Sequence, residues 1–374
     1  MLIEREAPRR RPRRWPLVAS ILVLVVAVAL WSRPDRVGLL LETVLPSPTP
    51  AASHTPPAAA VAATARAADA AGDVSGAIAA FATLAASDAA PAEAEIALAR
   101  LLSVRRRHAE AVQAGRSAVA LAGGDADAHA ALAFAYDWSG DLTAAVTEAL
   151  LALEIAPGHV PALAVLAEAY AGRGNWDEAV RTAQDALQRD PASPLAHRAL
   201  GFAREMAGQS DAALAAYRQA AALAPGWSQY LIDVGRVHRL RGEAVSAREA
   251  FEAALTADPS DPVVHDSLGL LAYDAGDLEE AEVRFRRAVA MEPRFAAGHG
   301  HLGWTYFRRQ RWAEAAESLE RAIELGATSP EYLYELGLAR IYLGDCAGGR
   351  PLLELALERD HTLQPARDGL RLCP

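Results

Sequence analysis

A strict 34-residue period constrains this chain more than any other feature of its sequence. Prolines, glycines and two separate sets of alanines all recur at that interval. Four series in one register predict stacked supersecondary units, each too small to bury its apolar face alone. The series run from Pro157 to Pro293, Gly201 to Gly337, Ala77 to Ala315 and Ala118 to Ala356.

The unit Pro262 to Phe295 shows the pattern most completely. Counted from Pro262, Leu268 and Gly269 take positions 7 and 8, Gly276 position 15, Ala281 position 20, Phe285 position 24, Ala288 position 27 and Pro293 position 32. This order resembles the tetratricopeptide repeat (TPR) family. The resemblance implies an all-α fold, a right-handed α-solenoid of about nine helix-turn-helix units. The units fill residues 58–363, and residues 364–374 predict a short capping helix.

Several repeat positions have a clear physical role. Gly or Ala at position 8 is expected to face the alanines at positions 20 and 27, so that the two helices of a unit approach closely. Gly at position 15 ends the first helix, although Arg106 occupies that position in the second unit. Asp141 and Asp277 are placed to cap second helices.

The N-terminal 57 residues differ from the repeats in charge and composition. Residues 1–14 form a basic tail, which precedes an uncharged run from Trp15 to Trp31. The arginines favour a cytoplasmic N-terminus and the apolar run a transmembrane signal-anchor, so that the repeats are exported. A cleaved signal peptide, giving a secreted protein, is the alternative, and a buried helix of a soluble protein is a third interpretation. The prolines of residues 32–57 predict an extended linker.

No catalytic motif accompanies the repeats. The chain has no Lys, which excludes a Schiff base or a P-loop lysine, and it lacks G-x-S-x-G, H-E-x-x-H and C-x-x-C. The net charge of −10 argues against nucleic acid as a partner. The sequence therefore predicts neither an enzyme nor a cofactor or metal site. His129, His197, His265 and His299 all take position 4, where packing is expected rather than a metal ladder.

The family resemblance implies that positions 2, 5, 9, 12 and 13 of each first helix line a concave groove. Aromatic and arginine side chains, which dominate binding hot spots, are frequent there. Several of them could instead fill contacts between neighbouring units, and both interpretations stay open. The candidates are Phe134, Trp138, Arg198, Phe202, Arg236, Arg239, Tyr273, Trp304, Phe307, Arg308 and Tyr334.

These features predict a membrane-anchored, exported scaffold that binds a protein or peptide in its groove. The alternative is a self-assembling structural component of an envelope complex. Trp304, Phe307, Arg308 and Tyr334 are the best hot-spot candidates, and Trp304 is expected to point away from the packed positions of its helix.

The two cysteines are a separate question. Cys346 begins the second helix of the last unit and Cys373 ends the capping helix. Antiparallel helices would bring the two together, so a disulfide is one interpretation and two free thiols the other.

Overall fold

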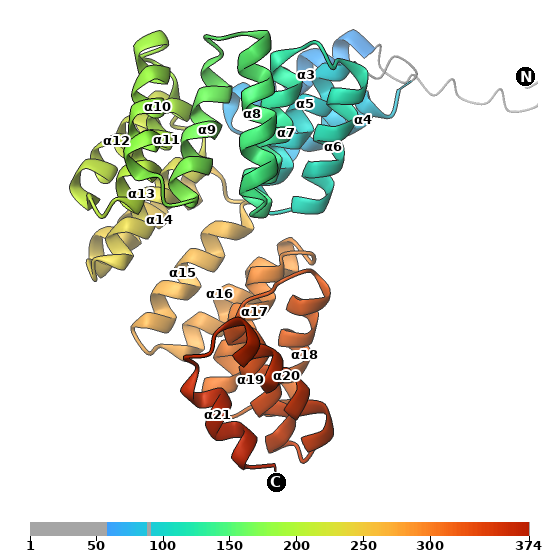
Figure 1. Cartoon of the computed structure of the whole chain (residues 1–374), viewed down its shortest axis with the longest axis vertical. Coiled ribbons are helices and arrows are strands. Elements are labelled where there is room, and N and C mark those ends of the chain that lie inside the picture. Colours follow the sequence, from blue (N-terminus) through green and yellow to red (C-terminus); the bar gives the residue numbers. More distant parts are fainter. Residues whose placement is uncertain (1–57, 88–90, 374) are drawn as a thin grey trace, which may run out of the picture. The chain divides into compact units, whose positions relative to one another are not determined.

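The computed structural model describes residues 58–87 and 91–373, and the regular elements of these residues are nineteen α-helices (Figure 1). The predicted basic tail, signal-anchor and linker lie outside the described residues. Of the helices described, none has both the length and the apolar character needed to cross a bilayer.

The helices come in pairs that follow the 34-residue frames of the sequence. Each frame from 58–91 to 330–363 holds two helices, and α21 follows the ninth pair, where the sequence predicts a cap. The helices are α3 (Ala58–Ala71), α4 (Val74–Ala85), α5 (Ala92–Val104), α6 (His108–Leu121), α7 (Ala126–Ser139), α8 (Leu142–Ile155), α9 (Val160–Gly172), α10 (Trp176–Arg189), α11 (Pro194–Met206), α12 (Ser210–Leu223), α13 (Ser228–Leu240), α14 (Ala244–Ala257), α15 (Pro262–Asp274), α16 (Leu278–Met291), α17 (Ala296–Arg308), α18 (Trp312–Glu324), α19 (Pro330–Tyr342), α20 (Cys346–Arg359) and α21 (Gln364–Arg371).

The turn inside each pair needs a left-handed residue at position 15. Gly140 provides it after α7 with φ 89°, as the sequence predicts. Arg106 and Gln310 take the same conformation, with φ 61° and 60°, although a side chain makes it less favourable. The position therefore imposes its geometry on whichever residue occupies it. The predicted caps are confirmed, because Asp141 accepts from the Ala144 amide and Asp277 from the Glu280 amide.

Position 8 packs against a different partner from the one that the sequence suggests. A Cβ built on Gly235 would lie 2.4 Å from the Phe251 ring, and one built on Gly269 would lie 2.6 Å from the Phe285 ring. These rings occupy position 24 of the second helix. The small residue thus makes room for a buried aromatic side chain, rather than only for the alanines at positions 20 and 27.

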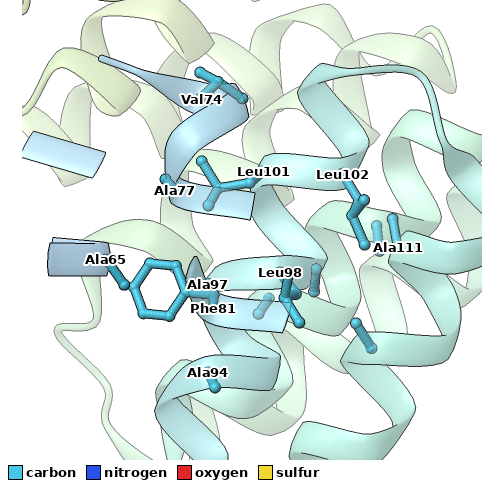
Figure 2. Packing of buried hydrophobic residues seen from close by; sticks show 14 of the residues in the cluster. Ala65, Val74, Ala77, Phe81, Ala94, Ala97, Leu98, Leu101, Leu102 and Ala111 are labelled. Carbon is cyan, nitrogen blue, oxygen red and sulfur yellow. The ribbon is translucent and has the colours of Figure 1, made fainter. Parts of the chain in front are cut away.

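The first two units build their core largely from alanine. Phe81 is 2% exposed and packs among Ala65, Ala77 and neighbouring leucines (Figure 2). Trp227, which lies between the fifth and sixth units in the sequence, also packs against this core. The N-terminal core is therefore completed by a side chain from far along the chain.

Further contacts join these distant parts of the helical body. Gly72 and Gly226 meet so closely that a Cβ on Gly72 would lie 2.1 Å from the Gly226 carbonyl oxygen. Near this contact, Arg105 pairs with Asp258 at 2.5 Å and with Asp261 at 3.0 Å, and all three side chains are buried. We call this set of residues the closing contact. It ties the turn after α3 to the turn between α12 and α13, and the end of α5 to the segment between α14 and α15.

Candidate functional site

A cavity of about 330 Å³ lies among the first helices of units one, two, three, five and six. These helices are α3, α5, α7, α11 and α13. Three of the candidates from the sequence, Phe134, Trp138 and Arg198, line it. A neighbouring cavity of about 150 Å³ shares the side chains of Arg100, Phe134 and Leu195. We call the larger space the inner cavity.

Aromatic rings and guanidinium groups form most of the inner cavity wall. Phe134 stacks on Trp138 with 5.2 Å between the ring centroids. The Arg198 guanidinium lies 4.7 Å from the Trp138 centroid, and that of Arg106 lies 4.5 Å from it. On another part of the wall, Arg100 lies 4.9 Å from the Trp227 ring. Such contacts hold flat side chains in defined orientations.

The arginines of this region are held by buried carboxylates. Arg198 donates from Nη1 to Glu168 at 2.6 Å and from Nε to Asp233 at 2.9 Å. Arg236 also pairs with Asp233, at 3.3 Å, and with Glu205. Removing Arg198 would leave the buried Glu168 without a cation, so this arginine in particular fixes the side chains beside the cavity.

Burial changes the protonation of two further groups beside this network. Burial, reinforced by the neighbouring Glu168 charge, raises the pKa of Asp137 to about 8, so its carboxyl is mostly neutral at pH 7. Burial lowers the pKa of Arg106 to about 10, which still leaves it charged. Asp137 therefore adds little negative charge to this network at neutral pH.

Two polar atoms of the cavity lining have no hydrogen-bond partner among the residues that the structure describes. They are Gln229 Oε1 and Trp138 Nε1. Gln229 is 3% exposed, and its Nε2 donates to Asp233 at 3.3 Å. Because a carboxylate only accepts, this bond fixes the amide orientation and leaves the carbonyl oxygen as a free acceptor. Both atoms have less than 1 Å² of accessible surface, so they are not open to a ligand in the cavity. The aromatic rings and guanidinium groups that line the open space make this cavity a candidate binding site.

Not all residues of the inner cavity follow from the groove positions. Arg100 and Gln229 occupy positions 9 and 2 of their units, so the repeat register could identify both. Trp227 and Tyr230 occupy positions 34 and 3, outside the groove positions, and the sequence does not single them out. They reach the cavity because the closing contact brings α13 beside α3 and α5.

The C-terminal candidates gather in a second cluster, where rings pack on rings. Trp304 lies 5.2 Å from Tyr332 and 6.3 Å from Tyr273, and Phe307 lies 5.1 Å from Trp312. Trp304 thus differs from the sequence expectation, since its half-buried ring bridges neighbouring units instead of pointing away from packed residues. Tyr334 is half-buried, whereas Arg308 is exposed and lies over the Tyr273 ring at 5.1 Å. We call this set the C-terminal aromatic cluster.

Glu335 lies beside Tyr334 in this cluster. The Tyr334 hydroxyl donates to Glu335 Oε1 at 3.4 Å, and burial raises the pKa of Glu335 to about 8. Glu335 Oε2 and Trp304 Nε1 are unpartnered within the described part of the chain. Asp137, beside the ion-pair network, and Glu335, in this cluster, are therefore both carboxyls that are mostly neutral at pH 7.

Two other candidates lie away from both clusters. Arg239 pairs with Asp274 at 2.6 Å, and Phe202 is half-buried against Val234 and its neighbours. The structure gives both residues contacts between neighbouring units.

The histidines at position 4 mostly bond backbone carbonyls rather than approach one another. His197 bonds the Pro191 carbonyl at 3.0 Å, and His299 bonds the Pro293 carbonyl at 3.1 Å. No group of three or more His, Cys, Asp or Glu side chains in residues 58–87 and 91–373 is arranged to hold a metal. Cys346 and Cys373 form a disulfide, with 5.7 Å between their Cα atoms.

Sequence comparisons identify repeats in the middle of the chain. Tetratricopeptide repeat models match residues 148–201, 207–262 and 267–330. No curated protein matches the chain.

Solved structures show the same fold at low sequence identity. One is a chain of the APC/C hetero-tetramer Cut9-Hcn1, with a TM-score of 0.58 and 18% identity over 78% of this chain. The chain spans 58% of the length of that structure. The human IFIT1 dimer with PPP-AAAA gives a TM-score of 0.51 and 16% identity, covering 72% of each chain. The repeat models thus match residues 148–201, 207–262 and 267–330, and the solved structures show the same helical-repeat fold as the nineteen described helices.

Proposed function

We propose that this chain is a non-catalytic scaffold whose repeats bind an extended protein segment along their inner surface. The inner cavity supports this proposal most directly. First helices of five units converge on it, and three of the groove candidates named from the sequence, Phe134, Trp138 and Arg198, line it. Buried ion pairs fix its wall before any partner arrives, which reduces the entropy lost on binding.

The N-terminal sequence extends this proposal to the membrane. The arginine-rich tail and the apolar run from Trp15 to Trp31 favour an anchored chain with exported repeats. A reporter that is active only outside the cytoplasm, fused after Pro374, should then be active. Activity of a cytoplasmic reporter alone would contradict export.

Self-association is the second candidate function, and the outer helices favour it. Leu150, Leu151 and Ile155 on α8, and Trp176 on α10, are 36–48% exposed. Such apolar side chains on neighbouring second helices could contact another copy of the chain. Light scattering on the purified full-length chain distinguishes the binding scaffold from the self-associating component. The binding scaffold should be monomeric without its partner.

Photo-crosslinking tests the binding proposal. Benzoylphenylalanine placed at Ala70, which lines the inner cavity, should capture a protein segment in cells. The same group at the exposed Ala253 of α14 is the control. Each captured segment is then synthesised and titrated against the full-length chain. Equal capture at both positions, or segments that fail to bind on titration, would contradict the proposal.

A further inference from the structure

The closing contact makes a ring of the first six units around the inner cavity. Consecutive units pack on one another, and the closing contact supplies the last junction, between units that are distant in sequence. We propose that this junction is a latch, which opens while the units stay folded and admits a protein segment to the inner cavity from the side. The entry of the segment rests on the proposed function, whereas the opening is a property of this chain alone.

Polar side chains hold the closing contact together. Arg105 pairs with Asp258 and Asp261. Its Nη2 also lies 3.2 Å from the Ser75 hydroxyl and 3.3 Å from the Ser260 hydroxyl, and the two hydroxyls are 3.0 Å apart. Water can replace each of these partners when the groups separate, so the net free energy of such contacts is much smaller than their gross strength. A junction of this kind can open and close again.

Opening the latch would not divide an apolar core. Apart from Trp227, the core of the first two units consists of side chains from residues 61–135, among those that the structure describes. The core around α13 to α16 contains no side chain of the first two units within the described ranges. Trp227 is half-buried, and its ring leaves the N-terminal core when the latch opens. The apolar area exposed on opening is therefore small beside that exposed on unfolding.

Gly226 shows that the sequence is suited to the closed form. It takes position 33 of its unit, where Arg294 carries a side chain in another unit, so the turn itself does not require glycine. A Cβ on Gly226 would lie 2.2 Å from the Ala71 carbonyl oxygen, across the latch. A Cβ on Gly158, at the same position of the third unit, would meet the flexible end of the Arg189 side chain. Closure therefore excludes a side chain at Gly226, and a side chain placed there should hold the latch open.

A disulfide across the latch tests whether it opens in the folded chain. Ser75 and Ser260 are both exposed, and cysteines at these positions are placed to form a bridge. Hydrogen exchange is measured on the oxidised Ser75→Cys/Ser260→Cys chain and on the Ser75→Ala/Ser260→Ala control. The bridge should slow exchange in residues 103–107 at least about tenfold and leave exchange in α10 unchanged. Equal exchange in the two chains would show that the contact opens only on unfolding, and it would overturn the latch.

A side chain at Gly226 tests the latch in the opposite direction. Gly226→Val should speed exchange in residues 103–107 at least about tenfold, because the new side chain meets the Ala71 backbone and keeps the junction open. Gly158→Val is the matched control and should leave that exchange unchanged. A Gly226→Val chain that folds, by circular dichroism, and exchanges like the parent would contradict the latch. If this variant does not fold, the bridged chain decides the question.

Association kinetics test entry from the side. The probe is the segment captured by photo-crosslinking from Ala70, either free or joined at both ends to a small folded domain that cannot pass through the ring. The bridge between positions 75 and 260 should slow association of the doubly blocked segment at least about tenfold, and that of the free segment less than about twofold. Equal rates for the blocked segment with and without the bridge would overturn entry through the latch.

The outcomes separate this inference from the proposed function. If no segment is captured from Ala70, the binding scaffold is contradicted and side entry with it, whereas hydrogen exchange still decides whether the latch opens. If a segment is captured and exchange in residues 103–107 is the same with and without the bridge, the scaffold stands and the latch is wrong.

Discussion

The inner cavity and the C-terminal aromatic cluster use the same repeat positions for different purposes. Position 13 holds Trp138 in the third unit and Arg308 in the eighth, and position 9 holds Phe134 and Trp304. Around the inner cavity, ion pairs hold the side chains beside an open space. In the C-terminal cluster, the rings fill the contact between units. A groove position thus becomes a binding surface only where the surrounding helices leave room.

The closing contact accounts for much of this difference. It brings α13 beside α3 and α5, so that Trp227 and Tyr230 complete a cavity that consecutive units alone do not form. The C-terminal cluster contains only side chains of neighbouring units. Its rings therefore pack on one another and stabilise the end of the helical body. Substitutions made separately in each of the two regions test this comparison.

The largest loss of stability is expected from Arg105→Met. The change leaves Asp258 and Asp261 buried without their cation, and it should lower the free energy of unfolding by about 3–5 kcal/mol. Urea unfolding of the full-length chain measures the loss. Arg66→Met is the control, because its pair with Glu93 is exposed and screened by solvent, so its loss should change stability little. Equal losses for the two variants would show that the closing contact does not stabilise the body.

The disulfide should have the next largest effect, confined to the C-terminal end. Its cysteines are 27 residues apart, and closing such a loop is worth about 3–4 kcal/mol in the chain-entropy model. Cys373→Ser should therefore increase hydrogen exchange in α20 and α21. Exchange in α5 should be unchanged. Increased exchange throughout the body would contradict a local role, and two free thiols on titration of the denatured, unreduced chain would contradict the bridge.

Trp304→Ala should weaken binding less than its groove position suggests, and it should lower stability more. Loss of a half-buried ring that bridges two units should lower the free energy of unfolding by about 2–4 kcal/mol. Affinity for a segment captured by photo-crosslinking from Ala70 should stay within about twofold. Unchanged stability with a large loss of affinity would instead make Trp304 a binding hot spot.

The last effect is a dependence of stability on pH, which appears only when unfolding is compared at several pH values. The pKa of Asp137 is raised to about 8, well above that of an unfolded carboxyl, so the folded chain holds an extra proton between about pH 4 and pH 8. This group therefore makes the fold less stable as the pH rises, by at most about 1.4 kcal/mol per pH unit.

Asp137→Asn removes this dependence. Relative to the parent chain, the variant should become more stable as the pH rises from 5 to 8. Glu335→Gln should behave alike, since the pKa of Glu335 is also raised to about 8. Urea unfolding at several pH values measures both differences. Parallel pH profiles of parent and variant would contradict the buried, neutral state of the carboxyl.

Sequence period and chemistry predicted the fold well, because they reflect local packing. The 34-residue register gives the helix pairs, and the position of Gly140 gives the left-handed turn. The inner cavity was only partly predictable. Phe134, Trp138 and Arg198 follow from the register, whereas Trp227 and Tyr230 depend on contacts between units distant in sequence. The repeat period describes how neighbouring units pack, but it does not predict contacts between units that are distant in sequence.

Trp304 shows a second limit of sequence reasoning. Helical spacing places it on the face opposite the packed residues of its own helix, and that inference considers one unit alone. Tyr332 of the next unit and Tyr273 of the preceding one contact its ring. Whether a groove position is open or filled depends on the side chains of adjacent units, so residue type at that position is not enough.

The central claim is that the inner cavity, rather than the C-terminal aromatic cluster, recognises the partner. Selection of peptides from a random library on the full-length chain tests it most directly. Ala70→Trp fills the inner cavity from an exposed position of α3. The selected peptides should lose at least about tenfold in affinity with Ala70→Trp and change less than about twofold with Arg308→Ala. Peptides that tolerate Ala70→Trp but lose their affinity with Arg308→Ala would contradict it.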